Sequence, residues 1–474
     1  RGMDEYFRRH DGQAATVEQF LAALGEANGV DLSPYLAWYE QAGTPRLHAR
    51  GSYDAQARRY TLTLAQHTPP TPGQPDKAPF VIPVAVGLVG ADGGELVEPR
   101  LLVLDEAEQS WRFEDVAAPP VPSLLRGFSA PVILDDGLDD GARLRLLAHD
   151  SDPFNRWEAA QRLMLDRLLG ALAQARPVRL DQPLADGLRA VLRSPTLEPA
   201  FKALVFAVPE EAFIAEQLAE VDPQRIHVAR EQLRDELAGA LHEDWVRAYE
   251  QHQVREGYAP SPAQSGRRAL ANRALAMLCR HAVRQHDAVW QGRAYQRFKD
   301  ASNMTERLGA ATALLDAHSA LADQVIQRLH HLARGDALML DKWFALQAQA
   351  GEPVGEGAGS AFARARTLLQ HPDFTLKNPN RVRSLLFVLC GHNPAAFHRA
   401  DAAGYVLWSD KLLELDALNP QLAARFARVM ERWNSLAEPY RSAAREAIAR
   451  VAARPGLSAD VHEIVTRALE GTAP

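Results

Sequence analysis

The chain has 474 residues, of which 47% are hydrophobic and 24% are charged. These proportions are typical of soluble globular proteins and exclude a wholly disordered chain. The net charge is −7, from 53 basic and 60 acidic residues, and the basic residues form no stripe, so we expect no nucleic-acid partner. No apolar run reaches the ~18 residues of a membrane-spanning helix, so we expect no membrane partner.

The length predicts two to four domains at ~100–200 residues per domain. Only two cysteines occur, Cys279 and Cys390, and they are far apart. They exclude a disulfide framework and a cysteine-ligated zinc site, and they favour a reducing compartment.

Residues 1–45 have the pattern of two helices. Thr16 and Gln19 form a capping box before an apolar face, and Ser33-Pro34 predicts the N-cap and first residue of a second helix. Two helices bury little surface, and the chain starts without an initiator methionine in helix-like sequence. We therefore expect this segment to be the end of a domain that lies upstream.

Residues 46–140 show the period-two alternation of half-buried strands. The proline-rich stretch 69–79 cannot be a central strand and predicts a loop. Short strands between turns predict a small β-sandwich. The alternating residues are Tyr60, Leu62 and Leu64, then Phe80, Ile82, Val84, Val86 and Leu88, and more briefly Trp111 and Phe113.

From residue 141 to residue 474 strand patterns are replaced by successive helices that end at proline or glycine. Such an array predicts a solenoid of stacked helix pairs, of the HEAT or ARM kind, whose concave face binds. The breaks include Ser194-Pro195, Asn378-Pro379, Asn393-Pro394 and Asn419-Pro420.

The histidines show no spacing that predicts a metal site. A zinc peptidase helix needs His-Glu-x-x-His, but His242-Glu243 and His462-Glu463 are followed by Val246 and Thr466 at the last position. The adjacent His330 and His331 point to different sides of a helix and are poor joint ligands. We therefore predict no metal ligand in this chain.

Other chemical motifs are equally weak. No Gly-x-Ser-x-Gly elbow or Walker loop occurs, and the glycines at 355–359 predict a flexible loop rather than a phosphate site. Asp150 and Asp152 most simply cap a helix start. Trp343 and Phe344 fit a core better than a cofactor site. We predict no catalytic residue.

One motif combines a turn with arginines. Asn378-Pro379 starts a turn, Asn380 can cap a helix, and Arg381 and Arg383 then fall in its first turn. Cations there oppose the helix dipole by about 0.3–1 kcal/mol, which calls for a compensating anion. That anion is either a structural carboxylate or a ligand. Arg425 follows a second Asn-Pro pair in a looser version of the same arrangement.

A series of short blocks runs in order along the whole chain. They are Gly2-Met3, Tyr6-Phe7, Arg9 to Thr16, Trp38, Gln41 to Pro45, Tyr60 to Leu64, Gln66, Thr68-Pro69, Thr71-Pro72, Ser302 to Thr305, Asp341 to Phe344, Asn378 to Ser384 and Asn393 to His398. The first blocks resemble the end of the catalytic domain of the M1 zinc aminopeptidases. The later blocks resemble the bacterial aminopeptidase N branch of that family.

The resemblance implies a four-part enzyme that removes N-terminal residues from peptides. Residues 1–45 would be the last helices of its thermolysin-like catalytic domain, 46–140 an Ig-like spacer, and 141–474 a helical cap over the active-site chamber. Zn²⁺ and the catalytic residues would lie upstream, so this chain alone would hold no cofactor and be inactive. The implied partners are peptides and the remaining domains, in a monomer in the bacterial cytoplasm.

A cap over a peptide site would offer cations to the C-terminal carboxylate of the substrate. Arg383 and Arg425 match arginines in the corresponding family blocks and are the candidates. Arg381 is the weaker candidate, for which a structural ion pair is expected. The residues alone leave a second hypothesis open, a non-catalytic interaction protein that binds a peptide or protein partner on the concave face.

Overall fold

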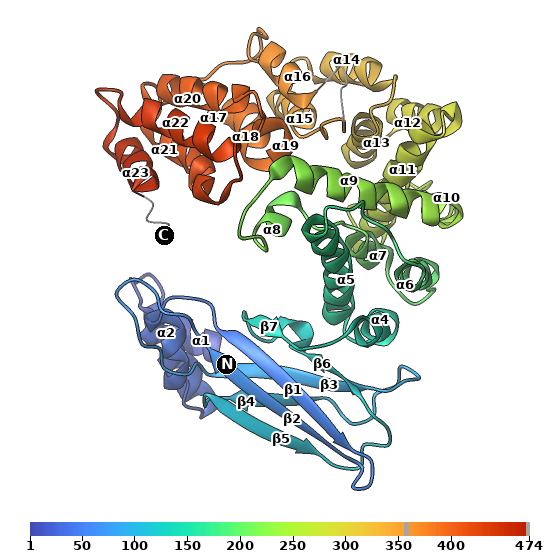
Figure 1. The fold of residues 1–474 in the computed structure, drawn as a ribbon, viewed down its shortest axis with the longest axis vertical. Coiled ribbons are helices and arrows are strands. Elements are labelled where there is room, and N and C mark those ends of the chain that lie inside the picture. The colour runs from blue at the N-terminus through green and yellow to red at the C-terminus, as the bar shows by residue number, and fades with distance from the viewer. Residues whose placement is uncertain (355–359, 471–474) are drawn as a thin grey trace. The chain divides into compact units, whose positions relative to one another are not determined.

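The computed structural model describes residues 1–354 and 360–470. The chain divides into two compact units, Arg1–Leu163 and Met164–Pro474 (Figure 1). Strands occupy the first unit and helices the second, which confirms the predicted fold class. The glycine-rich segment 355–359, predicted as a loop, lies outside the described residues.

A β-sandwich forms most of the first unit. One sheet has the strand order β5-β2-β1-β7 and the other the order β4-β3-β6. The strands are β1 (Arg46–Asp54), β2 (Arg59–His67), β3 (Ile82–Val89), β4 (Arg100–Leu104), β5 (Glu108–Phe113), β6 (Val121–Leu124) and β7 (Ile133–Asp135). The helical segments of this unit are α1 (Gly2–His10), α2 (Val17–Asn28), η1 (Ser33–Leu36), α3 (Ala37–Glu40), η2 (Arg126–Phe128) and α4 (Asp140–His149).

The predicted alternation sets the core of the sandwich. β1 pairs antiparallel with β2 and parallel with β7, whereas β3 is antiparallel to both β4 and β6. Because successive side chains of a strand point to opposite faces, one face of each strand is apolar and buried. The buried cluster between the sheets includes Leu47, Tyr60, Leu62, Leu64, Phe80, Ile82, Val84, Val86, Leu88, Leu102, Leu104 and Phe113.

The N-terminal segment follows the prediction at α2 and differs from it at Ser33. Thr16 and Gln19 form the predicted capping box of α2. Ser33 does not cap a helix, because the Asp31 carboxylate accepts its amide hydrogen at 2.9 Å and Ser33 becomes the first residue of the 3₁₀ turn η1. Trp38 then packs against the ring of Phe80, with a centroid distance of 4.7 Å.

A buried ion pair joins the sandwich to the residues that directly follow α4. The Arg126 guanidinium contacts the Asp150 carboxylate at 3.0 Å, and Ser123 donates a hydrogen bond of 2.6 Å to the same carboxylate. A side chain on Gly87 in β3 would collide with this guanidinium, so the strand needs glycine there. Asp152 caps the next helix as predicted, whereas Asp150 serves the ion pair instead.

Helices make up the second unit. The helix α5 (Pro153–Ala173) crosses the boundary between the units. It is followed by α6 (Gln182–Arg193), α7 (Pro199–Val205), α8 (Glu211–Ala215), α9 (Pro223–Ala240), α10 (His242–Gln251), α11 (Pro262–Arg284), α12 (Ala288–Asp300), α13 (Met304–Asp316), α14 (Ala322–Ala333), α15 (Ala337–Ala348), α16 (Ala361–Leu368), α17 (Pro379–Val382), η3 (Arg383–Phe387), α18 (Val388–His392), α19 (Pro394–Phe397), α20 (Ala403–Asp416), α21 (Pro420–Ala427), η4 (Arg428–Met430), η5 (Trp433–Ser435), α22 (Tyr440–Ala452) and α23 (Ala459–Leu469).

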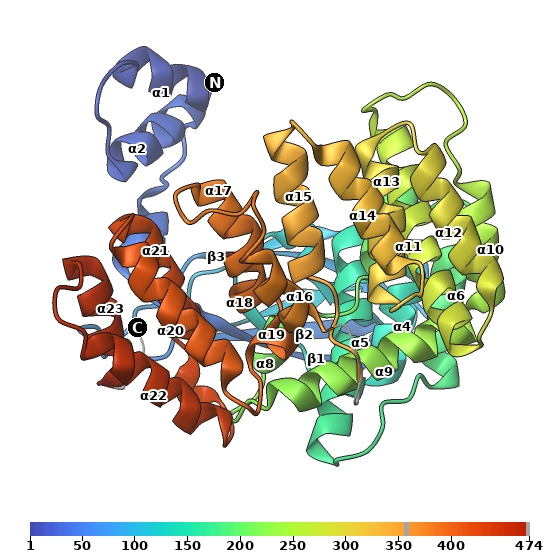
Figure 2. The same ribbon diagram turned by 90° about the horizontal axis from the view of Figure 1, so that it is seen from above.

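Neighbouring helices of this unit stack in chain order, as expected for a solenoid (Figure 2). The array also returns toward its start. Val221 pairs with Leu436 in a parallel bridge, and the Gln224 side chain donates to the carbonyl oxygens of Ala395 and His398 at 2.8 Å. These contacts join the segment around α9 to the last third of the chain.

Charged side chains are buried between the helices. The Glu231 carboxylate is contacted by Arg234 at 2.9 Å and by Arg280 at 2.5 Å. Burial alone would raise the pKa of Glu231, but the surrounding guanidinium groups outweigh it and hold the pKa far below its ordinary value. Glu231 therefore stays ionised and links α9 to α11.

Candidate functional site

The turn before Arg381 is built by Asn378 rather than by Asn380. The Asn378 side chain accepts the amide hydrogens of Asn380 and Arg381, at 3.0 Å and 3.3 Å, and so caps α17. The prediction that Asn380 is the cap was therefore wrong. Proline fits the first position of a helix and favours a cap on the residue before it.

Arg381 forms an ion pair within the protein and does not face solvent. The residue is 5% exposed, and its guanidinium forms an ion pair of 2.6 Å with Asp341 from α15. It also lies over the ring of Phe344 at 5.2 Å. The anion that the sequence calls for at this position is thus a structural carboxylate.

Arg383 has a different environment two residues further on. It is exposed, begins the π-helical turn η3, and its guanidinium donates to the Asn380 side chain at 3.1 Å. Within residues 1–354 and 360–470 it forms no ion pair. Its guanidinium therefore remains able to bind an anion from solution.

Arg425 lies in the last turn of α21, which Asn419 caps. At this end of the helix a cation favours the dipole, so Arg425 does not repeat the unfavourable position expected for it. It is exposed and lines a cavity of about 530 Å³ with Arg428, Glu463 and Arg467. The described part of the chain offers Arg425 no ion-pair partner.

The elements that carry Arg383 and Arg425 are neighbours. Phe387, in the same π-helical turn as Arg383, packs against Phe426, which follows Arg425, with a ring distance of 5.2 Å. Figure 2 shows the segment α17–α18 beside α21. Two exposed arginines are thus carried on adjacent segments, and neither forms an ion pair with a described carboxylate.

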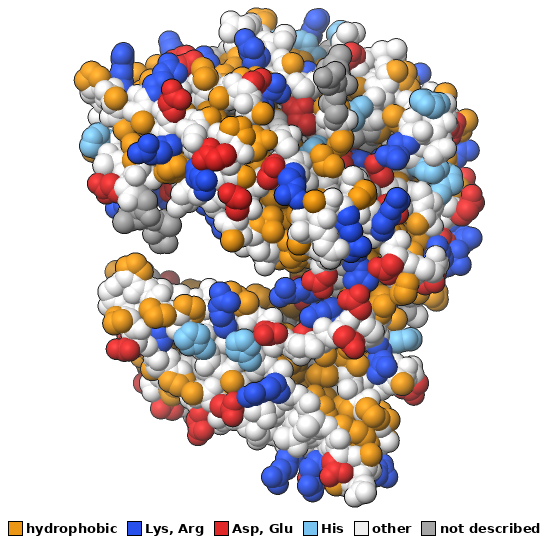
Figure 3. All heavy atoms as spheres, viewed as in Figure 1, with side chains coloured by type: hydrophobic (Ala, Val, Ile, Leu, Met, Phe, Trp, Pro, Cys, Tyr) orange, Lys and Arg blue, Asp and Glu red, His pale blue; other side chains and the backbone are white. Residues whose placement is uncertain are grey.

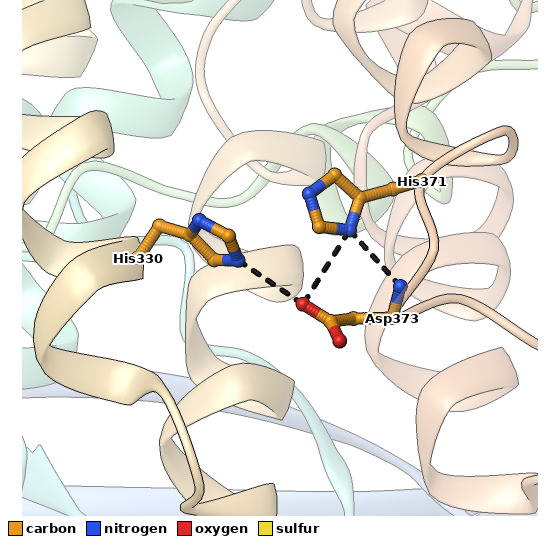
Figure 4. Close-up of side chains that lie close together, drawn as sticks. All are labelled: His330, His371 and Asp373. Atoms are coloured by element: carbon orange, nitrogen blue, oxygen red, sulfur yellow. Dashed lines mark hydrogen bonds and ion pairs between the residues drawn. The ribbon is translucent and has the colours of Figure 1, made fainter.

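A second cluster next to this region was not predicted. His330 from α14 meets His371 and Asp373 from the loop between α16 and α17 (Figure 4). The nitrogen Nε2 of His330 lies 3.1 Å from the Asp373 carboxylate, and Nδ1 of His371 lies 3.6 Å from it. Spacing could not reveal this cluster, because its members come from separate segments and form no short motif.

Aromatic packing connects the cluster with the arginine motif. The Trp343 ring stacks on His330 at 4.4 Å and contacts His371 at 5.1 Å. Phe344 contacts His371 at 6.0 Å and also lies under Arg381. Trp343 and Phe344 are buried, as expected for core residues.

The two cysteines do not lie in an environment that would make a thiol reactive. Both cysteines are buried, and burial raises the pKa of the Cys279 thiol to about 12 and also raises that of Cys390.

No helix in the described ranges is long and apolar enough to cross a membrane. On the face drawn in Figure 3, basic and acidic side chains are interspersed.

Comparison with known proteins defines the family. A model described as a domain of unknown function with ARM repeats, DUF3458_C, matches residues 140–470. A second, DUF3458 with an Ig-like fold, matches residues 43–137. The chain therefore belongs to the family that these two models define, and its curated relatives are aminopeptidases N.

The relatives extend over almost the whole chain. Aminopeptidase N of Caulobacter vibrioides is 39% identical over 469 residues, which cover 99% of this chain and 53% of that protein. Aminopeptidase N of Escherichia coli is 34% identical, over 99% of this chain and 54% of that protein. The crystal structure of Legionella pneumophila aminopeptidase A in complex with aspartic acid matches 99% of this chain and 54% of that one, with 26% identity and a TM-score of 0.86. The chain thus spans about half the length of its curated relatives.

Proposed function

We propose that this chain is the C-terminal portion of a zinc-dependent aminopeptidase that removes N-terminal residues from peptides. The single observation that carries the proposal is the similarity to bacterial aminopeptidases N over 99% of the chain. In this proposal the sandwich is a spacer and the helical unit encloses the active-site chamber. The longer enzyme is a cytoplasmic monomer.

The zinc ligands of the longer enzyme are proposed to lie outside this chain. Neither His-Glu pair of the sequence has the second histidine that a zinc peptidase helix requires. The residues of this chain therefore do not fit the catalytic metal, and their proposed work is to bind and orient the substrate.

Arg383 and Arg425 are proposed to bind the C-terminal carboxylate of the peptide. Both are exposed, and neither has an ion-pair partner among the described residues. A guanidinium can bind a carboxylate through two parallel hydrogen bonds, which fixes the orientation of the peptide as well as its position. Arg381 has the supporting role, because its ion pair with Asp341 holds the start of the segment that carries Arg383.

The test compares peptides with a free and an amidated C-terminus, using the longer enzyme. Losing a hydrogen bond to a charged group costs about 1.5–3 kcal/mol, so Arg383→Ala and Arg425→Ala should each lower kcat/KM for free peptides by roughly 10- to 100-fold. The amidated peptides should be unaffected. Arg445→Ala, at an exposed arginine of α22, is the matched control. An equal loss on both kinds of peptide would contradict carboxylate binding.

A further inference from the structure

The His–Asp cluster (His330, His371 and Asp373) has the composition of a metal site. Two imidazole nitrogens and a carboxylate oxygen lie within 4.8 Å of one another, and Figure 4 shows both rings directed at the carboxylate. Imidazole nitrogens favour zinc and related transition metals, whereas magnesium and calcium favour oxygen ligands. The donor set therefore selects the first group of ions.

Both separations from the Asp373 carboxylate fit one shared ion. A tetrahedral zinc ion with bonds of about 2.0–2.2 Å holds its ligand atoms about 3.3–3.5 Å apart. The two contacts with the Asp373 carboxylate, 3.1 Å from His330 and 3.6 Å from His371, bracket that separation.

The surroundings orient the rings and leave them accessible. Trp343 stacks on His330 and contacts His371, so both rings are held by a buried side chain. The histidines are 22% and 23% exposed and Asp373 is 42% exposed. An ion can therefore enter from solvent, and water can supply its fourth ligand.

We propose that His330, His371 and Asp373 bind one divalent transition-metal ion, with Zn²⁺ as the physiological ion. The amide of Asp373 donates a hydrogen bond of 3.2 Å to Nδ1 of His371, and binding exchanges this bond for the metal. The ion then links α14 to the loop that leads into α17. It fastens the segment that carries Arg381 and Arg383 to the preceding helix pair.

Titration of the 474-residue chain with Zn²⁺ in a calorimeter tests the site. We expect one equivalent to bind, and His330→Ala and Asp373→Asn to weaken this binding at least tenfold. His331→Ala, at the exposed neighbouring histidine, should leave it unchanged. Absence of a stoichiometric equivalent, or equal binding in all three variants, would overturn the proposal.

A competing histidine pair provides an internal check. The rings of His242 and His281 lie 4.5 Å apart, so zinc bound there would be lost in His242→Ala and kept in His330→Ala. That outcome would also refute the site. Asp373→Asn keeps the size of an exposed side chain, so it carries the test if His330→Ala does not fold.

A spectroscopic readout locates the ion. Because Trp343 touches both imidazoles, Co²⁺ or Ni²⁺ at this site should quench its fluorescence, and Zn²⁺ should reverse the quenching. The variant Trp343→Phe should lose most of the quenching. Quenching that persists at full strength in Trp343→Phe would place the ion elsewhere.

Discussion

The interior between the two sheets and the interior between the helices of the second unit differ in composition. Between the two sheets the buried cluster is apolar, with residues such as Leu62 and Val84 fully buried. Between the helices, ionised side chains such as Glu231 and Arg268 are buried as well. The stability of an apolar interior depends on the total apolar area that is buried. The stability of an interior with buried charges depends on each charge keeping its partner. The two units should therefore fail in different ways when single side chains are removed.

The largest effect is expected in the ionic interior. Glu231→Ala leaves the guanidinium groups of Arg234 and Arg280 without their shared carboxylate. Removing one partner of a buried pair costs about 4 kcal/mol, measurable as the free energy of unfolding of the helical unit in urea. Glu216→Ala, which removes the exposed partner of the exposed Arg432, should cost less than about 1 kcal/mol. Equal losses would remove the proposed difference between buried and exposed pairs.

A somewhat smaller effect is expected in the apolar interior. Leu62 is fully buried in β2, so Leu62→Ala removes apolar contacts and leaves a cavity. The expected loss is about 3 kcal/mol of unfolding free energy. Leu101→Ala, at a leucine that is 64% exposed, should change the stability by less than about 0.5 kcal/mol. A loss in Leu101→Ala as large as in Leu62→Ala would contradict the assignment of the core.

Acid should destabilise the helical unit through His398. Burial lowers the pKa of His398 from 6.5 to about 4, and its Nδ1 is hydrogen-bonded to the Tyr405 hydroxyl at 2.9 Å. Because the unfolded chain takes up the proton first, the stabilisation is complete above pH 6.5 and is lost as the pH falls towards 4. The loss should reach about 2 kcal/mol at pH 5.

The variant His398→Gln isolates this contribution. Glutamine can still form a hydrogen bond with Tyr405 but does not titrate. The free energy of unfolding should therefore change less with pH between pH 6.5 and 4. His331→Gln, at an exposed histidine, should retain the slope of the unchanged protein. A slope that survives in His398→Gln would assign the acid sensitivity to other groups.

The smallest effect is expected at the capping box of α2. Thr16 accepts the amide hydrogen of Gln19, so Thr16→Ala should cost about 1 kcal/mol. The loss should appear as faster hydrogen exchange in the first turn of α2. Thr16→Ser keeps the hydroxyl and should restore most of the protection. Equal exchange in both variants would show that the cap is not used.

Within the first unit, the sequence predicts the strands of the sandwich better than the short turn that precedes them. Alternation along residues such as Leu62 and Val84 identifies which face is buried, because the period of a strand is two residues. The short 3₁₀ turn at Ser33 could not be foreseen, because it depends on capture of its amide by Asp31. A local hydrogen bond there overrides the pattern of an N-cap followed by proline.

The candidate site also combines residues that the sequence identifies with contacts that only the fold reveals. Three arginines share similar sequence surroundings, yet Arg381 is buried in an ion pair while Arg383 and Arg425 are exposed. The partner that decides this difference, Asp341, lies in another helix. The His–Asp cluster is also assembled from separate segments, so only the folded chain reveals it.

The central proposal is that this chain is part of a peptide-trimming enzyme and does not perform the chemistry by itself. Release of a chromogenic group from an alanyl substrate should be measured for the longer enzyme and for the 474-residue chain at equal concentration. The account predicts chelator-sensitive turnover by the longer enzyme and none by the chain. Turnover by the purified chain, abolished by a chelator, would contradict it.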